Sequence, residues 1–294
     1  MGAKLMMGTT LKQVETLLAS ASLPTARGLH WKDGFRGRLN TGVGEAQIQL
    51  NATGGVRIRM KLKRRPVPAE ALVLNAALPA NLRVAGPAHR RHLLADVSCH
   101  PASFSRNLSE IRQGIRRNAN GTGRNRRPPR GERGPYEHLF DQIRNGEGSS
   151  DVGESSLDVV DRDPGWEIGL RVRGGRVAVR VSPERNGLRL YRIVLKQAEL
   201  SAVESGPGGR SVSDLALRLN ERMRFVRLAR LDAGVVVEAR LSRAFADVER
   251  VVETARAIAV VSAAVRIPLQ LLVQMEGVAR CYADTFDLPY GEAQ

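Results

Sequence analysis

The sequence predicts an α+β fold made of two tandem copies of a small antiparallel sheet, each with helices packed on one face. Three observations lead to this fold class. Part of the chain repeats in the same order, short segments alternate apolar with polar residues, and longer segments place apolar residues at helical spacing. The 294 residues, 42% of them apolar, suffice for two modest cores.

The repeat is clearest around two Leu- and Asn-containing segments. Residues 72–75 read LVLN and residues 217–220 read LRLN, and the stretches that follow, to Ser98 and to Ser242, differ in length by one residue. Two further matches keep the same order: a strand, a Gly-Gly turn and a strand at 47–60 and 167–181, and a helix at 104–115 and 245–258. Three ordered matches indicate a duplicated domain.

In the first copy, Thr9 or Thr10 is expected to cap a helix that ends before Pro24. Alternating residues then predict strands at 48–50 and 56–60. Arginines interleave with the apolar residues of these strands. One face of the sheet should therefore be buried, and the other solvated and basic.

The second copy has the fuller set of predicted elements. The pattern predicts a final helix beginning near Ala246, which Pro268 should break or kink, and a Gly-rich connection lies at 205–210. The elements expected before that helix are a helix at 135–143, strands at 168–172, 177–181 and 187–195, a helix at 212–223, and a hairpin of 225–231 and 235–241 around Asp232-Ala233-Gly234. The first copy is expected to abbreviate the strand that corresponds to 187–195.

The segment from Leu215 to Phe225, continued by Val235 to Ala239, resembles the YbjN-like branch of the type III secretion chaperone-like superfamily. The resemblance covers most of 135–265 and, more faintly, 9–117. It implies a noncatalytic α+β fold that dimerises or binds protein segments across its sheet and helices. Classical members are acidic and this chain is basic with two copies, so the resemblance carries over the fold rather than the secretion role.

The expected organisation is a first copy at 1–117, a basic linker at 118–134, and a second copy with a carboxyl-terminal extension at 135–294. The linker is rich in Arg, Gly, Pro and Asn and cannot bury an apolar face. Residues 147–163 are acidic and could fold back on these arginines as a loop.

The formal net charge of +16 suits a polyanionic partner, although only six of the 46 cations are lysines and an Arg-rich coding habit explains the charge equally well. Guanidinium groups bind phosphate bidentately. No aromatic residue lies between Phe104 and Tyr136, so base stacking is not expected in the linker. The candidate nucleic-acid-binding residues are Arg116, Arg117, Arg124, Arg126, Arg127, Arg130 and Arg133. A solvated spacer is the alternative interpretation of the linker.

Neither a metal site nor a catalytic motif is predicted. His92, Asp96, Cys99 and His100 are close in sequence, but on a strand Cys99 would point away from His92 and Asp96. We expect polar residues near the surface at a strand end. The Gly-rich segments lack a P-loop ending, and no nucleophile elbow occurs.

Four residues outside these motifs also receive an interpretation. Asn75 and Asn220 are expected to end their helices as left-handed caps. Trp31 and Trp166, each near the start of a sheet, are expected to pack in a core or at a sheet edge. The tail at 275–294 is expected to dock on its own domain, with a role as a partner segment as the alternative.

The two cysteines lack paired spacing, which favours a reducing cytoplasm, and no targeting or membrane-spanning segment is recognised. The function expected is noncatalytic protein binding by a chaperone-like or adaptor module without a cofactor. The two copies are expected to form an intramolecular pseudo-dimer or a homodimer. The alternative is a nucleic-acid-associated protein that binds the phosphate backbone through the Arg-rich linker and the basic sheet faces.

Overall fold

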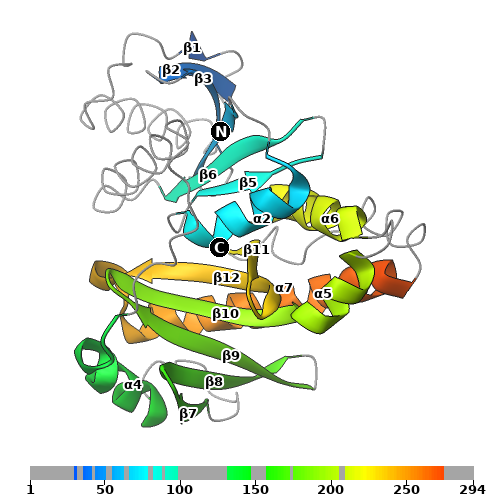
Figure 1. Ribbon diagram of the computed structural model, residues 1–294. Helices are drawn as coiled ribbons and strands as arrows, with labels where there is room; N and C mark the ends of the chain where they lie inside the picture. Colours follow the sequence, from blue (N-terminus) through cyan, green and yellow to red (C-terminus); the bar gives the residue numbers. More distant parts are fainter. Residues whose placement is uncertain are drawn as a thin grey trace, which may run out of the picture.

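The computed structural model describes residues 30–31, 36–41, 44–50, 55–62, 66–78, 82–87, 90–98, 131–146, 157–172, 175–204 and 209–274. These residues form two six-stranded antiparallel sheets with helices, so the predicted α+β fold class is confirmed (Figure 1). The helix expected after Thr9 or Thr10, the helix at 104–115 and the tail at 275–294 lie outside the described residues.

Sheet one has the strand order β1-β2-β3-β4-β6-β5. Helix α2, Pro68–Ala77, connects β4 to β5. The strands are β1 (His30–Trp31), β2 (Arg36–Thr41), β3 (Gly44–Leu50), β4 (Gly55–Lys61), β5 (Leu82–Ala85) and β6 (His92–Ser98).

Sheet two has the corresponding order, β7-β8-β9-β10-β12-β11. Its strands are β7 (Asp158–Arg162), β8 (Gly165–Val172), β9 (Gly175–Glu184), β10 (Gly187–Lys196), β11 (Arg227–Leu231) and β12 (Gly234–Ser242). Its helices are the 3₁₀ turn η2 (Gly134–Tyr136), α4 (Glu137–Arg144), α5 (Gln197–Glu204), α6 (Gly209–Arg222), the 3₁₀ turn η3 (Arg243–Phe245) and α7 (Val248–Gln274).

The shared strand order corrects the sequence alignment of the two copies. The hairpin β3–β4 occupies the place of β9–β10, because β4 pairs with β6 as β10 pairs with β12. The strand at 187–195 is therefore not an addition of the second copy. The elements missed from the sequence are β1 and β2 in the first copy and β7 and α5 in the second, and β7 lies in the segment expected to be an acidic loop. Only Val159 of β7 is buried, so this edge strand carries almost no apolar alternation.

The core of sheet two lies between the strands and α7, which packs along β8, β9, β10 and β12. Val177, Val179 and Val181 are buried on this side of β9, whereas Arg176 and Arg180 are exposed on the opposite side, which we call the outer face of the sheet. This alternation confirms the prediction of one buried and one solvated face in the second copy, but the solvated face is mixed in charge rather than basic, because Asp158 and Glu167 lie among its arginines.

Helix α7 continues through Pro268 to Gln274, so of the two expected effects of this proline, a break or a kink, the break does not occur. By length and composition, residues Val248–Val273 could cross a membrane, although no such segment is recognised in the sequence. Half of that stretch is buried inside the protein, and a core helix passes the same test.

Trp166 packs in the core as predicted. It is buried and stacks on Phe140 of α4, with ring centres 3.9 Å apart and planes 9° apart. The guanidinium of Arg133 lies 4.7 Å from the centre of the Trp166 ring. The side chain of Trp31 lies outside the described part of the chain.

Candidate functional site

Helices α2 and α6 lie side by side between the two sheets (Figure 1). Each helix packs against the edge strand of the other copy as well as its own: α2 contacts β11, and α6 contacts β5. The backbone N–H of Gly86, just after β5, donates to the carbonyl of Leu217 in α6 over 2.9 Å. The last turns of both helices therefore end over the opposite copy.

Two equivalent asparagines form hydrogen bonds with free backbone groups of the edge strands next to these helices. The Asn75 amide bonds to the backbone of Val84 in β5, accepting from N–H at 2.6 Å and donating to C=O at 3.2 Å. Asn220 does the same with Leu228 in β11, at 2.6 Å and 2.9 Å. Each side chain thus takes the place that the backbone of a further strand would fill.

The expectation that these asparagines are left-handed helix caps is wrong. Asn75 and Asn220 lie inside α2 and α6 and are fully buried, and the one described non-Gly residue with positive φ is Phe225. The Asn75 amide also donates to the Leu228 carbonyl of the second copy over 3.1 Å. A buried side-chain amide that faces the edge of a strand can bond to both the N–H and the C=O groups of that strand, so these groups satisfy it better than the end of its own helix would.

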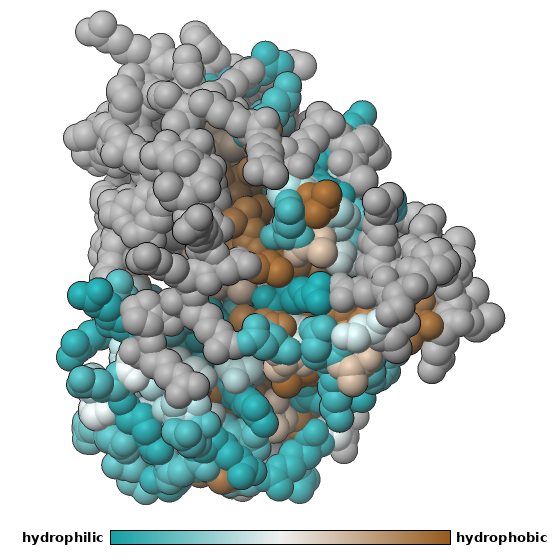
Figure 2. Space-filling view, viewed as in Figure 1, coloured by the Kyte–Doolittle hydropathy of each residue, from teal (hydrophilic) through white to brown (hydrophobic). Residues whose placement is uncertain are grey.

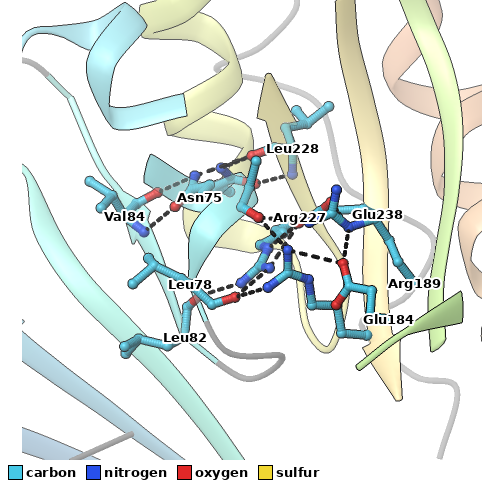
Figure 3. A network of polar contacts seen from close by, with 12 residues as sticks. Asn75, Leu78, Leu82, Val84, Glu184, Arg189, Arg227, Leu228 and Glu238 are labelled. Atoms are coloured by element: carbon cyan, nitrogen blue, oxygen red, sulfur yellow. Dashed lines mark hydrogen bonds and ion pairs between the residues drawn. The ribbon is translucent and has the colours of Figure 1, made fainter. Parts of the chain in front are cut away.

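Arg227 in β11 reaches from the second copy to the end of α2 in the first (Figure 3). Its Nη1 donates to the Leu82 carbonyl at 2.6 Å and its Nη2 to the Leu78 carbonyl at 2.8 Å. Its charge is balanced by Glu238, whose Oε1 lies 2.8 Å from both Nε and Nη2. Both side chains are buried, so this is a dehydrated ion pair that also satisfies carbonyls at a helix end.

Arg83 in β5 makes the reciprocal contact. Its Nε donates to the Asn220 carbonyl over 2.8 Å and its Nη2 to the Met223 carbonyl, at the end of α6. Its Nη1 lies 2.6 Å from Oδ2 of Asp96 in β6. A positive charge next to the negative end of a helix dipole is stabilising, and here each copy supplies it to the other.

A second reciprocal pair comes from the neighbouring strands. Arg57 of β4 donates to the Glu221 carbonyl at 3.1 Å, and Arg189 of β10 donates to the Ala76 carbonyl at 2.9 Å. Arg240 of β12 also donates to the end of α2. We call this set the arginine clasp: Arg57, Arg83, Arg189, Arg227 and Arg240, with Asp96, Glu184 and Glu238 as their carboxylate partners.

The clasp has the reciprocity of an isologous interface, in which the same patch is used from both sides. Arg83 follows Asn75 by eight residues and Arg227 follows Asn220 by seven, so the duplicated sequence supplies both halves. The halves differ in where the acid stands. Glu238 lies directly opposite Arg227 in the strand register, whereas Asp96 lies two residues beyond Leu94, the residue opposite Arg83.

The clasp shifts the ionisation of its buried groups. Burial opposes the ionisation of Asp96, but Arg83 and Arg57 outweigh it and hold the Asp96 pKa below its ordinary value. Burial is the main cause that lowers the pKa of His92, which lies on the same strand, to below 6.5. Asp96 is therefore ionised and His92 neutral at neutral pH.

The structure places the residues considered for metal binding differently from the expectation. His92 and Asp96 are buried rather than near the surface, and the Asp96 carboxylate is held by two arginines. Within the described residues, no group of three His, Cys, Asp or Glu side chains could hold a metal ion. Cys99 and His100 lie outside those residues.

Of the candidate nucleic-acid-binding arginines, Arg133 lies in the described part of the chain. It pairs with Asp161 of β7 at 2.6 Å and with Glu137 of α4 at 3.2 Å. Asp161 belongs to the acidic segment, so one linker arginine does meet that segment. The other candidates, Arg116, Arg117, Arg124, Arg126, Arg127 and Arg130, lie outside the described residues.

No protein-family model matches the chain, and no curated protein or solved structure matches it either.

Proposed function

We propose that the chain is a noncatalytic protein-binding module, of the chaperone-like or adaptor kind, in which a duplicated YbjN-like domain forms an intramolecular pseudo-dimer. The arginine clasp is the observation that carries this proposal. The buried charged side chains of the described residues, Arg83, Arg91, Asp96, Arg227 and Glu238, are all ion-paired. They hold the two copies together, which leaves the exposed strand faces as the surfaces for a partner.

The outer face of β7, β8 and β9 is the surface that best suits a protein. Its exposed arginines alternate with carboxylates, and Glu167 lies 3.9 Å from both Arg162 and Arg180. Gly169 and Ala178 face each other in the register between these charges. Figure 2 shows that the lower part of the molecule, where these strands lie, is mostly hydrophilic. Positive and negative side chains around these two small residues can complement charges of either sign on a partner, and the small residues let the partner's backbone come close to the sheet.

The proposal is tested by purifying the tagged full chain from its native cells at moderate salt. A defined polypeptide should co-purify with the wild type and be lost with Ala178→Arg, which places a long side chain at the centre of this face. Glu253→Arg, at an exposed position of α7, is the control and should retain the polypeptide. Failure to recover a polypeptide, or equal recovery with Ala178→Arg, would contradict the proposal.

A further inference from the structure

The outer face of sheet one differs in charge from the equivalent face of sheet two. The described side chains exposed on it are all basic or amide, namely Arg38, Gln47, Gln49, Arg59 and Lys61. The acidic residue in the sequence of β2, β3 and β4 is Glu45, which stands opposite Asn40 in the strand register and two positions before Gln47. Among the described exposed side chains, a cationic, hydrogen-bonding surface replaces the mixed charge of the second copy.

The strand register places these side chains in a row across the sheet. Arg38 of β2 lies opposite Gln47 of β3, which lies opposite Arg59 of β4. Adjacent strands are about 4.8 Å apart, so the two arginines stand about 10 Å apart with an amide between them. Lys61 follows Arg59 on the same side of β4. The face thus offers several cations to one extended anionic chain.

An exposed aromatic residue follows closely on a backbone group that this face holds. Phe225, in the turn between α6 and β11, is 57% exposed and has a positive φ of 58°. Such a conformation is strained for a bulky residue. The turn is held in place by Arg57, whose Nη2 donates to the Met223 carbonyl over 3.0 Å. Arg57 and Arg59 alternate onto the same side of β4, so the backbone two residues before Phe225 is held against the strand that carries the basic residues.

Glu221, in the last turn of α6, also links that helix to the strand β4. Its carboxylate lies 2.6 Å from Nη2 of Arg59, which is itself 45% exposed. The ion pair joins the last turn of α6 to the sheet and leaves part of the guanidinium open to solvent. An exposed aromatic residue with a positive φ, in a turn whose backbone is bonded to the cationic strand, is a feature that folding alone does not require.

We propose that the outer face of β2, β3 and β4, together with Phe225, binds single-stranded nucleic acid. Arg59, Lys61 and Arg38 would bind the phosphates, Gln47 and Gln49 would bond to sugar and base edges, and one base would stack on the Phe225 ring. This surface lies in the first copy and is separate from the protein-binding face proposed for the second. An acidic peptide offers the same charge but no base to stack, and the exposed aromatic ring therefore favours the nucleic acid.

The test is fluorescence anisotropy of a labelled single-stranded RNA of about 12 nucleotides with the full chain, at about 50 and about 200 mM salt. We expect Arg59→Gln with Lys61→Gln to weaken binding about tenfold or more and to lower the salt slope by about one for each cation removed. Phe225→Leu should weaken binding about tenfold while leaving the salt slope unchanged, because it removes the flat ring and no charge.

The matched control is Arg171→Gln with Arg180→Gln, which makes the same change of charge at exposed positions on the outer face of sheet two. This double variant should bind RNA like the wild type. An equal loss of RNA affinity in the control would overturn the proposal, because binding would then depend on the overall charge of the protein and not on this face. Binding lost only when Arg124, Arg126, Arg127 and Arg130 are all replaced by Gln would assign the activity to the linker instead.

A competition experiment distinguishes nucleic acid from an acidic protein as the partner of this face. Unlabelled RNA should displace the labelled RNA far better than poly-glutamate of equal charge. Equal displacement by poly-glutamate, together with wild-type affinity for Phe225→Leu, would assign the face to an acidic protein and overturn the proposal. The substituted positions in the described part of the chain are exposed, and unchanged urea midpoints should show that each variant is folded.

Discussion

Arg227→Met removes one half of the arginine clasp and should destabilise the protein strongly. Arg227 and Glu238 are 2% and 0% exposed, so the substitution leaves a carboxylate buried without its main partner. Arg189 remains, but at 3.5 Å from the other carboxylate oxygen. The Leu82 carbonyl loses the donor given by Arg227, whereas the Leu78 carbonyl keeps Arg240.

These losses set the magnitude. Breaking a buried ion pair from one side costs about 3–5 kcal/mol, and an unsatisfied buried carbonyl adds about 1 kcal/mol. We therefore expect Arg227→Met to lower the free energy of unfolding by about 4–6 kcal/mol. Replacing both partners, Arg227→Met with Glu238→Leu, should recover most of this loss, because the unpaired charge is gone.

The assay is urea unfolding followed by circular dichroism, with all four members of the double-mutant cycle. Arg180→Met is the control, since Arg180 is more than half exposed and its ion pair spans 3.9 Å, and it should cost about 0.5 kcal/mol or less. A loss below about 1 kcal/mol for Arg227→Met would refute the reasoning, as would a double variant no more stable than the single one.

Four further outcomes are expected. Asn75→Leu should lower the free energy of unfolding by about 2–4 kcal/mol in urea unfolding, because it leaves buried backbone groups of both copies without partners, and a loss under about 0.5 kcal/mol would contradict this role. Acidification from about pH 7 to about pH 5 should lower stability, because the folded pKa of His92 is depressed and the unfolded state takes up the proton first; His92→Gln should remove much of this slope, and an unchanged slope would exclude His92 as its source. Below about pH 4 a further loss should follow as Asp96, whose folded pKa is also depressed, becomes protonated, and Asp96→Asn should flatten that part of the profile. Arg192→Leu should raise the urea midpoint, because a guanidinium N–H of Arg192 is buried without a partner and burial lowers its pKa; an unchanged or lower midpoint would show that this N–H is satisfied in solution.

The elements that could be predicted are those with a local signal. The hairpin β11–β12 can be predicted because apolar residues are concentrated on both sides of a turn that ends in Gly234, and Gly234 does adopt a positive φ of 126°. The strand β7 was missed because Val159 is its one buried residue, so its sequence shows almost no alternation of apolar and polar residues. Local patterns report the burial of side chains, and β7 has little of it, whereas the opposite edge strand β11 is covered by α2 and shows its apolar residues.

The clasp could not be predicted because its contacts join residues more than 100 positions apart. In the sequence, Arg57 and Arg59 look alike, as basic residues alternating with apolar ones. In the structure, Arg57 bonds to the end of α6 and Arg59 is partly open to solvent. One signal was present: Arg83 and Arg227 stand at nearly the same distance after Asn75 and Asn220. An arginine kept at the same place in both repeats indicates a shared structural role.

Hydrogen exchange followed by mass spectrometry, on the wild type and on Arg227→Met, tests most directly the claim that each copy secures the other. Arg227 belongs to the second copy, but the carbonyls that it holds belong to α2 and β5 of the first. The account predicts faster exchange in α2 and β5 as well as in β11 of the variant. Faster exchange confined to the second copy, with α2 and β5 as protected as in the wild type, would contradict it.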